Sequence, residues 1–181
     1  MKRLNLGCGK NHSIPDAVTV DINPQIGADV IHDLNISPWP FIDNTFEEIY
    51  CYDALEHLDN IVHVMEEIHR ISKPGAKVFI TTPHFSSRNA FTDPTHIHYF
   101  GIHSFDYFSI NCNNNYSKWN FYSSAEFKII KVEVHFEPNL INKLIWRIAH
   151  RYPDLWERRL AWMFPAWFMS VGLLVIKGDH R

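Results

Sequence analysis

The stretch Leu4-Asn5-Leu6-Gly7-Cys8-Gly9-Lys10 decides the fold, together with Val18-Thr19-Val20-Asp21 a short loop later. The first stretch begins as a short apolar run suited to a buried strand. Gly7 and Gly9 then let the backbone turn sharply and approach a ligand with no side chain in the way. Asp21 ends a second buried strand, where a carboxylate is placed to accept hydrogen bonds from ribose hydroxyls. The pattern indicates a nucleoside-binding half of a doubly wound sheet.

The glycine turn differs from that of a nicotinamide dinucleotide site. Such a site has a Gly-x-Gly-x-x-Gly turn, and this chain has His12 where the third glycine would stand. The acidic residue of such sites also normally lies about 20 residues further on, whereas Asp21 is closer to the glycines. The sequence therefore disfavours an NAD(P)-dependent reductase, which stays an alternative function.

The first half of the chain resembles the class I S-adenosylmethionine-dependent methyltransferases, especially the small type 11 branch. The resemblance covers residues 1 to about 85 and rests on five landmarks in the family's order, one of which contains its Leu-Glu-His signature. These landmarks are residues 4–10, 20–24, 29–34, 46–58 and 71–80. The chain departs from the family in two places, since Asn5 stands where many members have an acidic residue and Asn11 where many have a third glycine.

The resemblance implies S-adenosyl-L-methionine as the cofactor. It also implies an α/β fold with a Rossmann-like, doubly wound sheet of seven strands, mostly parallel with an antiparallel last strand. In this family pattern Asp21 holds the ribose hydroxyls, Asp33 and Leu34 hold the adenine, and Gly7 and Gly9 hold the methionine end. The predicted cofactor-binding residues are Asn5, Gly7, Cys8, Gly9, Lys10, Asp21, Ile22, Asp33, Leu34, Tyr52 and Asp53.

Composition agrees with one globular domain, since the 181 residues are 46% hydrophobic and 20% charged. The formal net charge of −3 gives no case for a nucleic-acid partner. Cys8, Cys51 and Cys112 are dispersed, which favours reduced thiols and argues against a disulfide framework or zinc knuckle. A core strand begins almost at the first residue, so we expect no signal peptide and a cytoplasmic location.

Hydrophobic periodicity predicts the elements. Apolar runs predict strands at residues 3–6, 17–22, 29–32, 47–52, 76–82, 127–134 and 171–177. Apolar side chains at three-to-four spacing predict an amphipathic helix over 59–72, with Asp59 as its N-cap and Pro74-Gly75 as its end. Alternation of strands and helices along the chain favours parallel βα units.

We expect a single methyltransferase domain over residues 1–181. Residues 1–85 would form its cofactor-binding half and residues 84–125 a loop on the acceptor side. Residues 139–168 would form a helical lid or insertion between the last two strands. Asn111-Cys112-Asn113-Asn114-Asn115 is predicted to be a polar loop.

Histidines supply the candidate catalytic groups. Methyl transfer from a sulfonium needs an aligned acceptor, exclusion of water and, for a hydroxyl or amine, removal of a proton. Four of the 12 histidines lie in residues 84–103, and another follows the fourth strand. Histidine titrates near neutral pH, so His57, His96 and His98 are the candidate bases. His96 and His98 are two residues apart and would share a face only on a strand.

Other interpretations of this region stay open. Asp93-Pro94 could cap a turn beneath a lid of aromatic side chains, His57 could orient the next helix, and Glu56 could be a solvated charge. A metal site at these histidines is the least favoured interpretation and no metal ligand is predicted, because no Glu or Cys ligand sits at a recognisable spacing. Similar Asp-Pro-x-His segments border the acceptor pocket in small bacterial methyltransferases that this chain resembles. The predicted substrate-binding residues are His84, Asp93, His96 and Tyr99.

The C-terminal third combines tryptophan and arginine. Residues 139–163 show an amphipathic helical pattern, and residues 160–176 are uncharged. That uncharged run is near the lower length limit for a membrane span, but Pro165 and Gly172 interrupt it. A helical lid is the favoured interpretation. Peripheral contact with a membrane surface is the alternative, and it would suit a lipid-linked acceptor.

The predicted function is transfer of a methyl group to an oxygen or nitrogen atom of a small-molecule or glycolipid-like acceptor. A non-catalytic module that binds S-adenosylmethionine or a membrane surface is the second alternative. It would bind the cofactor but would tolerate loss of His57, His96 and His98.

Overall fold

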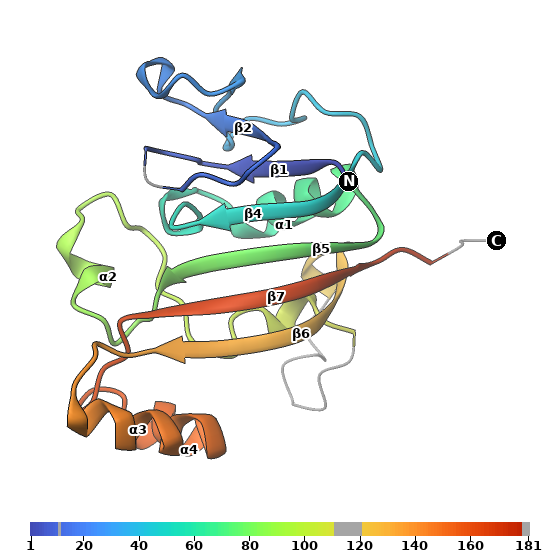
Figure 1. Cartoon of the computed structure of the whole chain (residues 1–181). Coiled ribbons are helices and arrows are strands. Elements are labelled where there is room, and N and C mark those ends of the chain that lie inside the picture. Colours follow the sequence, from blue (N-terminus) through green and yellow to red (C-terminus); the bar gives the residue numbers. More distant parts are fainter. Residues whose placement is uncertain (11, 111–120, 179–181) are drawn as a thin grey trace.

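The computed structural model describes residues 1–10, 12–110 and 121–178. Its strands form one seven-stranded sheet in the order β3-β2-β1-β4-β5-β7-β6 (Figure 1). The strands are β1 (Arg3–Leu6), β2 (Ala17–Asp21), β3 (Val30–Ile31), β4 (Phe46–Tyr52), β5 (Ser72–Pro83), β6 (Glu126–His135) and β7 (Phe168–Ile176). The predicted positions at Asn11, Cys112 and the 111–115 loop lie outside the described residues. Every predicted strand is present, with bounds that differ by a few residues.

Strand directions confirm the predicted Rossmann-like topology. β1 is parallel to β2 and β4, β2 is parallel to β3, and β4 is parallel to β5. β7 is antiparallel to both β5 and β6. The chain reverses its direction of winding between β1 and β4, and ligands of open α/β sheets bind beyond the carboxyl ends of the strands at such a switch point.

The helix after β4 follows the predicted periodicity. This helix, α1, spans Ile61–Ile71 and turns its apolar side chains toward the sheet. The predicted N-cap is wrong, because the side chain of Asn60 accepts the cap hydrogen bond from the His63 amide at 3.1 Å. The Asp59 amide instead donates to Asn35 Oδ1.

The predicted end of this helix is also wrong. Both the amide and the hydroxyl of Ser72 donate to the carbonyl of Ile68, which satisfies an orphan carbonyl of the last turn. The chain then enters β5 directly, so Pro74-Gly75 lies within that strand.

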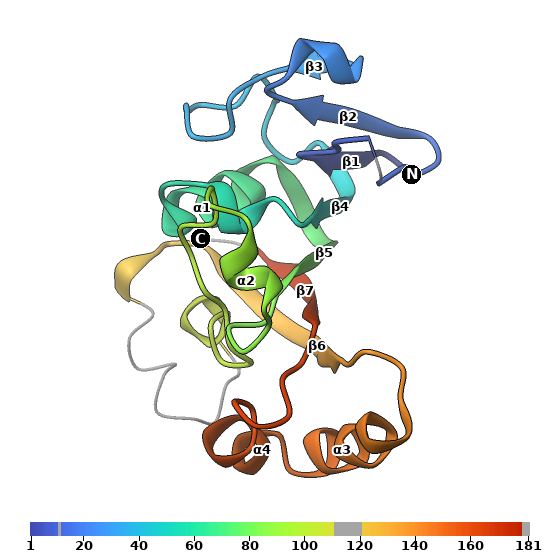
Figure 2. The ribbon, with the colours of Figure 1, turned by 90° about the vertical axis from the view of Figure 1, so that its left-hand side faces the viewer.

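Strands and helices alternate less than the sequence predicts. In the described part of the chain, no α-helix separates β1 from β2, β2 from β3, or β3 from β4. Residues 7–16, which join β1 to β2, are fewer than the dozen or so that a helical crossover needs. Figure 1 therefore looks directly onto a sheet face with α1 behind it, and Figure 2 shows the sheet edge-on.

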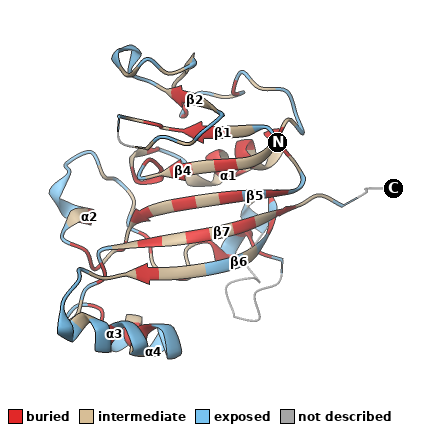
Figure 3. Ribbon diagram, in the orientation of Figure 1, coloured by how far each residue is buried: buried red, intermediate tan, exposed pale blue. Residues whose placement is uncertain are grey.

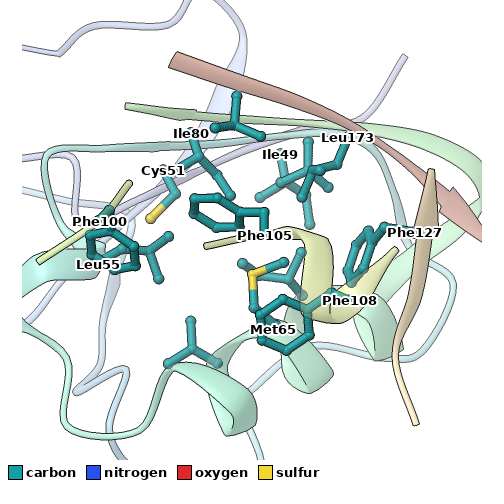
Figure 4. Close-up of a cluster of buried hydrophobic side chains, with 14 of the residues drawn as sticks. Ile49, Cys51, Leu55, Met65, Ile80, Phe100, Phe105, Phe108, Phe127 and Leu173 are labelled. Carbon is teal, nitrogen blue, oxygen red and sulfur yellow. The ribbon is translucent and has the colours of Figure 1, made fainter. Parts of the chain in front are cut away.

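The core lies on the helical side of the sheet. Buried and half-buried residues alternate along β4, β5 and β7, so each strand turns one face inward (Figure 3). Figure 4 shows Phe105, Phe108, Phe127 and Met65 packed beneath the sheet. The segment that follows β5 thus fills the core together with α1.

Two further helices, α3 (Leu140–Arg151) and α4 (Pro153–Arg159), stand between β6 and β7 in the chain. Trp156 of α4 is fully buried and packs against the ring of His84. Among the described residues, no helix combines the length and apolar character that a membrane crossing requires. A short helix, α2 (Asn89–Thr92), lies in the loop after β5.

Candidate functional site

The turn after β1 places two glycines in left-handed backbone for different reasons. Gly7 has φ +60°, and a Cβ added there would lie 2.6 Å from the Cβ of Ala54. Gly9 has φ +50°, and an added Cβ would meet no atom within 4 Å. Gly7 therefore lets the turn pack against the end of β4, whereas Gly9 borders open space that a ligand can approach.

Asp21 at the end of β2 ties this turn to the sheet. Its Oδ2 accepts a hydrogen bond from the Gly9 amide, and its Oδ1 accepts one from the Asn23 amide, both at 2.9 Å. The two bonds fix the orientation of the carboxylate. Each carboxylate oxygen has a second lone pair, so Asp21 retains the capacity to accept from ribose hydroxyls.

Asp33 and Asp53 follow β3 and β4 at the same edge of the sheet. Asp33 Oδ1 accepts from the Asn35 amide at 2.9 Å. Asp53 has φ +50°, and its Oδ1 accepts from the Thr81 hydroxyl at 3.0 Å. The carboxylates of Asp21, Asp33 and Asp53 thus follow the carboxyl ends of β2, β3 and β4, where ligands bind at a switch point of such a sheet.

Other predicted cofactor residues divide by exposure. Asn5 is fully buried, where its Nδ2 donates to the His12 carbonyl and its Oδ1 lacks a hydrogen bond. Cys8 and Leu34 are also buried, and burial followed by the nearby Asp21 charge raises the pKa of the Cys8 thiol. These three residues support the walls of the site. Ile22, Lys10 and Tyr52 keep exposed surface.

Glu56 is a buried carboxyl, so the alternative interpretation of it as a solvated charge is wrong. It lies in a short 3-10 helix after β4 (η2, Leu55–His57) and is 1% exposed. Neither carboxyl oxygen makes a hydrogen bond of normal geometry. Burial raises the pKa of Glu56 to about 7, and the charge of Asp53 adds to this while the Thr82 hydroxyl opposes it.

Two of the three candidate bases meet at this carboxyl group. The rings of His57 and His96 have centroids 4.6 Å apart, and His96 Nε2 lies 3.9 Å from Glu56 Oε1. His98 lies apart, with its Nε2 3.3 Å from the Asp59 carbonyl oxygen. The segment that carries His96 and His98 is not a strand, so the two residues have different partners.

The predicted acceptor-side residues have mixed environments. His84 is fully buried between Ser86 Oγ at 2.8 Å and Glu157 Oε1 at 3.0 Å, so it connects the β5 end to α4. Asp93 accepts from the amide and hydroxyl of Thr95, which caps a turn. Tyr99 is half exposed and stacks on Phe91. The role of Glu157 was missed, because its partner is distant in the chain.

A cavity of about 340 Å³ separates the loop after β5 from the helical insertion. Ser87 and Arg88 line one wall, and Glu137, Ile141 and residues 163–167 line the rest. Arg88 and Glu137 approach each other at 3.4 Å across it. Its size suits a small-molecule site.

Part of the sequence matches a known protein family, and the fold matches solved structures. Residues 4–80 match the family model of the methyltransferase domain. Comparison with curated proteins gives no match. The fold is shared with a SAM-dependent methyltransferase from Archaeoglobus fulgidus, at TM-score 0.65 and 16% identity over 96% of this chain and 85% of that one.

Two other solved structures share the fold. A S-adenosylmethionine-dependent methyltransferase from Mesorhizobium loti has TM-score 0.56 and 14% identity, over 96% of this chain and 90% of that one. The [4+2]-cyclase SpnF has TM-score 0.54 and 16% identity, over 98% of this chain and 75% of that one. The cyclase shows that the fold alone does not define the reaction.

The family match covers the part of the chain that holds the predicted cofactor motifs, because residues 4–80 contain the glycine turn, Asp21 and the Leu-Glu-His segment. The sheet order and the carboxylates at its switch point agree with it. Residues 4–80 are thus similar to the methyltransferase domain, and the chain as a whole shares the fold of solved S-adenosylmethionine-dependent methyltransferases.

Proposed function

We propose that this protein is an S-adenosylmethionine-dependent methyltransferase that acts on an oxygen or nitrogen atom of an amphiphilic acceptor of the glycolipid type. The observation that carries the proposal is the cavity between Ser87-Arg88 and the helical insertion, because its lining combines the charged pair Arg88 and Glu137 with exposed apolar side chains. S-adenosylmethionine, when bound, supplies the electrophilic methyl group.

The cofactor would be held by Gly9, Asp21, Asp33 and Asp53. Open space beside Gly9, the spare lone pairs of Asp21 and the carboxylates after β3 and β4 all support this assignment. Gly7 and Asn5 would act indirectly by supporting the turn.

The acceptor would occupy the cavity with its polar part toward Arg88 and Glu137. Apolar side chains also line the cavity, and Ile141 is 64%, Met163 71% and Trp167 41% exposed. Exposed apolar clusters of this kind mark ligand grooves and membrane or protein contacts. An apolar tail that packs against these side chains would cover them, and so would peripheral contact with a membrane surface.

The acceptor must also be activated, since a hydroxyl or amine loses a proton on methylation. The cluster of Glu56, His57 and His96 is our candidate for that task. It is supported by its position after β4, where the carboxyl ends of the strands meet the loop that follows β5.

Cofactor binding is tested by titration calorimetry with S-adenosylhomocysteine. We expect Asp21→Asn to weaken binding at least tenfold, because the ribose loses its carboxylate partner. Asp16→Asn is the matched control, since Asp16 precedes β2 and Asn also tolerates its positive φ. Binding of NAD or NADP instead, or equal binding by the Asp21 variant, would contradict the assignment.

The acceptor class is tested with S-adenosylmethionine labelled in its methyl group. The protein is incubated with a lipid extract and, separately, with a water-soluble extract of the producing organism. We expect label in the lipid fraction, and less of it with Ile141→Ser or Met163→Ser than with Ile42→Ser, an exposed residue outside the cavity. Label in the water-soluble fraction alone would refute an amphiphilic acceptor. Normal cofactor binding without any methylation would favour the non-catalytic module.

A further inference from the structure

We propose that Glu56, His57 and His96 bind one divalent transition-metal ion. One ligand atom from each residue lies within 4.8 Å of the other two. Around a tetrahedral ion with bonds of about 2.1 Å, ligand atoms lie roughly 3.4 Å apart. The separation of 3.9 Å between His96 Nε2 and Glu56 Oε1 needs only a small side-chain rotation to reach that value.

Hydrogen bonds fix the tautomers of both imidazoles. The Thr95 hydroxyl donates to Asp93 Oδ1 at 2.7 Å, so its oxygen must accept from His57 Nδ1–H at 2.9 Å. The Ala90 carbonyl can only accept, so His96 Nδ1–H donates to it at 3.3 Å. Each ring therefore carries a proton on Nδ1, so its neutral form presents a lone pair at Nε2. Metal-binding histidines are typically held in this way, through the nitrogen that does not bind the metal.

Glu56, the third member of the cluster, is influenced by the Thr82 hydroxyl but forms no hydrogen bond of normal geometry with it. Glu56 is 1% exposed, and neither of its oxygens has a hydrogen bond of normal geometry. A proton shared with His96 does not satisfy it, since 3.9 Å exceeds the length of a hydrogen bond. Buried polar groups are normally paired, and a cation would satisfy the carboxylate and both lone pairs together.

The donor set indicates the kind of ion. Two imidazoles and one carboxylate suit Zn²⁺, Mn²⁺, Fe²⁺ or Co²⁺, whereas Mg²⁺ and Ca²⁺ prefer oxygen ligands alone. Three protein ligands leave positions for water or a substrate atom. An acceptor oxygen bound there would lose its proton more readily. This last role rests on the proposed function, but binding of the ion does not.

The test uses protein freed of metal by chelation, without cofactor or acceptor. Co²⁺ is followed by its visible absorption, and Zn²⁺ by calorimetry. We expect one ion per chain and no heat with Mg²⁺. Glu56→Gln and His96→Gln should each weaken binding at least tenfold. His98→Gln should not, because His98 lies on the same segment but contacts Asp59.

Circular dichroism and thermal unfolding of each variant exclude loss of fold as the cause. Absence of binding, wild-type affinity in the Glu56 and His96 variants, or an equal loss in His98→Gln would each overturn the proposal. Because no methylation is measured, a wrong acceptor class leaves these results unchanged, and a wrong metal site leaves S-adenosylhomocysteine binding unchanged.

Discussion

Substitution of Gly7 should damage stability, whereas the same substitution at Gly9 should damage binding. Left-handed backbone costs a residue other than glycine about 1–2 kcal/mol. This cost applies to both positions, at φ +60° and +50°. At Gly7 the new Cβ also lies 2.6 Å from Ala54 Cβ, and overpacking of that kind costs typically about 1–3 kcal/mol more. Gly7→Ala should therefore destabilise the protein by about 2–5 kcal/mol, and Gly9→Ala by about 1–2 kcal/mol.

Guanidinium unfolding measures the free energies of unfolding, with Gly75→Ala as the control. Gly75 has φ +75° and open space around its added Cβ, so it reports the backbone cost alone. S-adenosylhomocysteine binding is measured on the same proteins below their unfolding transitions. We expect Gly9→Ala to bind at least tenfold more weakly, and Gly75→Ala to bind normally. Equal stability of the Gly7 and Gly75 variants would refute the packing argument.

Three further predictions concern pH, an ion pair and metal removal. Burial alone would lower the pKa of His103, but hydrogen bonds to Asp154 and Asp106 raise it. The stability that protonated His103 contributes through these hydrogen bonds is fully present below about pH 6.5. It is lost as the pH rises through the raised pKa of His103 in the folded protein. The gap in melting temperature between wild type and His103→Gln should accordingly shrink from pH 5.5 to 8.5, and a constant gap would contradict this.

Arg70→Met should destabilise the fold by about 2–4 kcal/mol in urea unfolding at pH 7, because the nearly buried carboxylate of Glu67 loses its partner. At pH 3 we expect Arg70→Met to lower the free energy of unfolding by less, because the Glu67 carboxylate is then protonated. An equal decrease at both pH values would argue against a stabilising Arg70–Glu67 ion pair. Chelation of metal should abolish methylation but leave S-adenosylhomocysteine binding intact, and methylation that survives chelation would exclude a metal-dependent step.

Elements defined by local chemistry were predictable from the sequence. The buried parallel strands read as short apolar runs, and α1 follows from apolar side chains at helical spacing. The errors at its two ends arose because neighbouring residues compete to cap a helix. Asn60 and Ser72 prevailed over Asp59 and Pro74-Gly75 through hydrogen bonds that a pattern does not reveal. The missing helices between β1 and β2 and between β2 and β3 follow from connections too short to hold them, residues 7–16 and 22–29.

The candidate site was partly predictable for the same reason. The positions of the glycine turn and of Asp21 follow from the local sequence, because each comes directly after a strand whose end fixes its direction. Glu56 gave no signal of its own, because burial depends on which segments cover it. His84 was expected at the acceptor, but Trp156 and Glu157 of α4 bury it.

The sequence by itself determined the seven-stranded α/β fold and the similarity of residues 4–80 to a methyltransferase domain. These properties depend on periodicity and on motifs within a few residues. Only the tertiary structure decided that Glu56 meets His57 and His96, and that the insertion and the β5 loop enclose a cavity. Such contacts join residues distant in the chain, and their distances and burial exist only once the layers have packed.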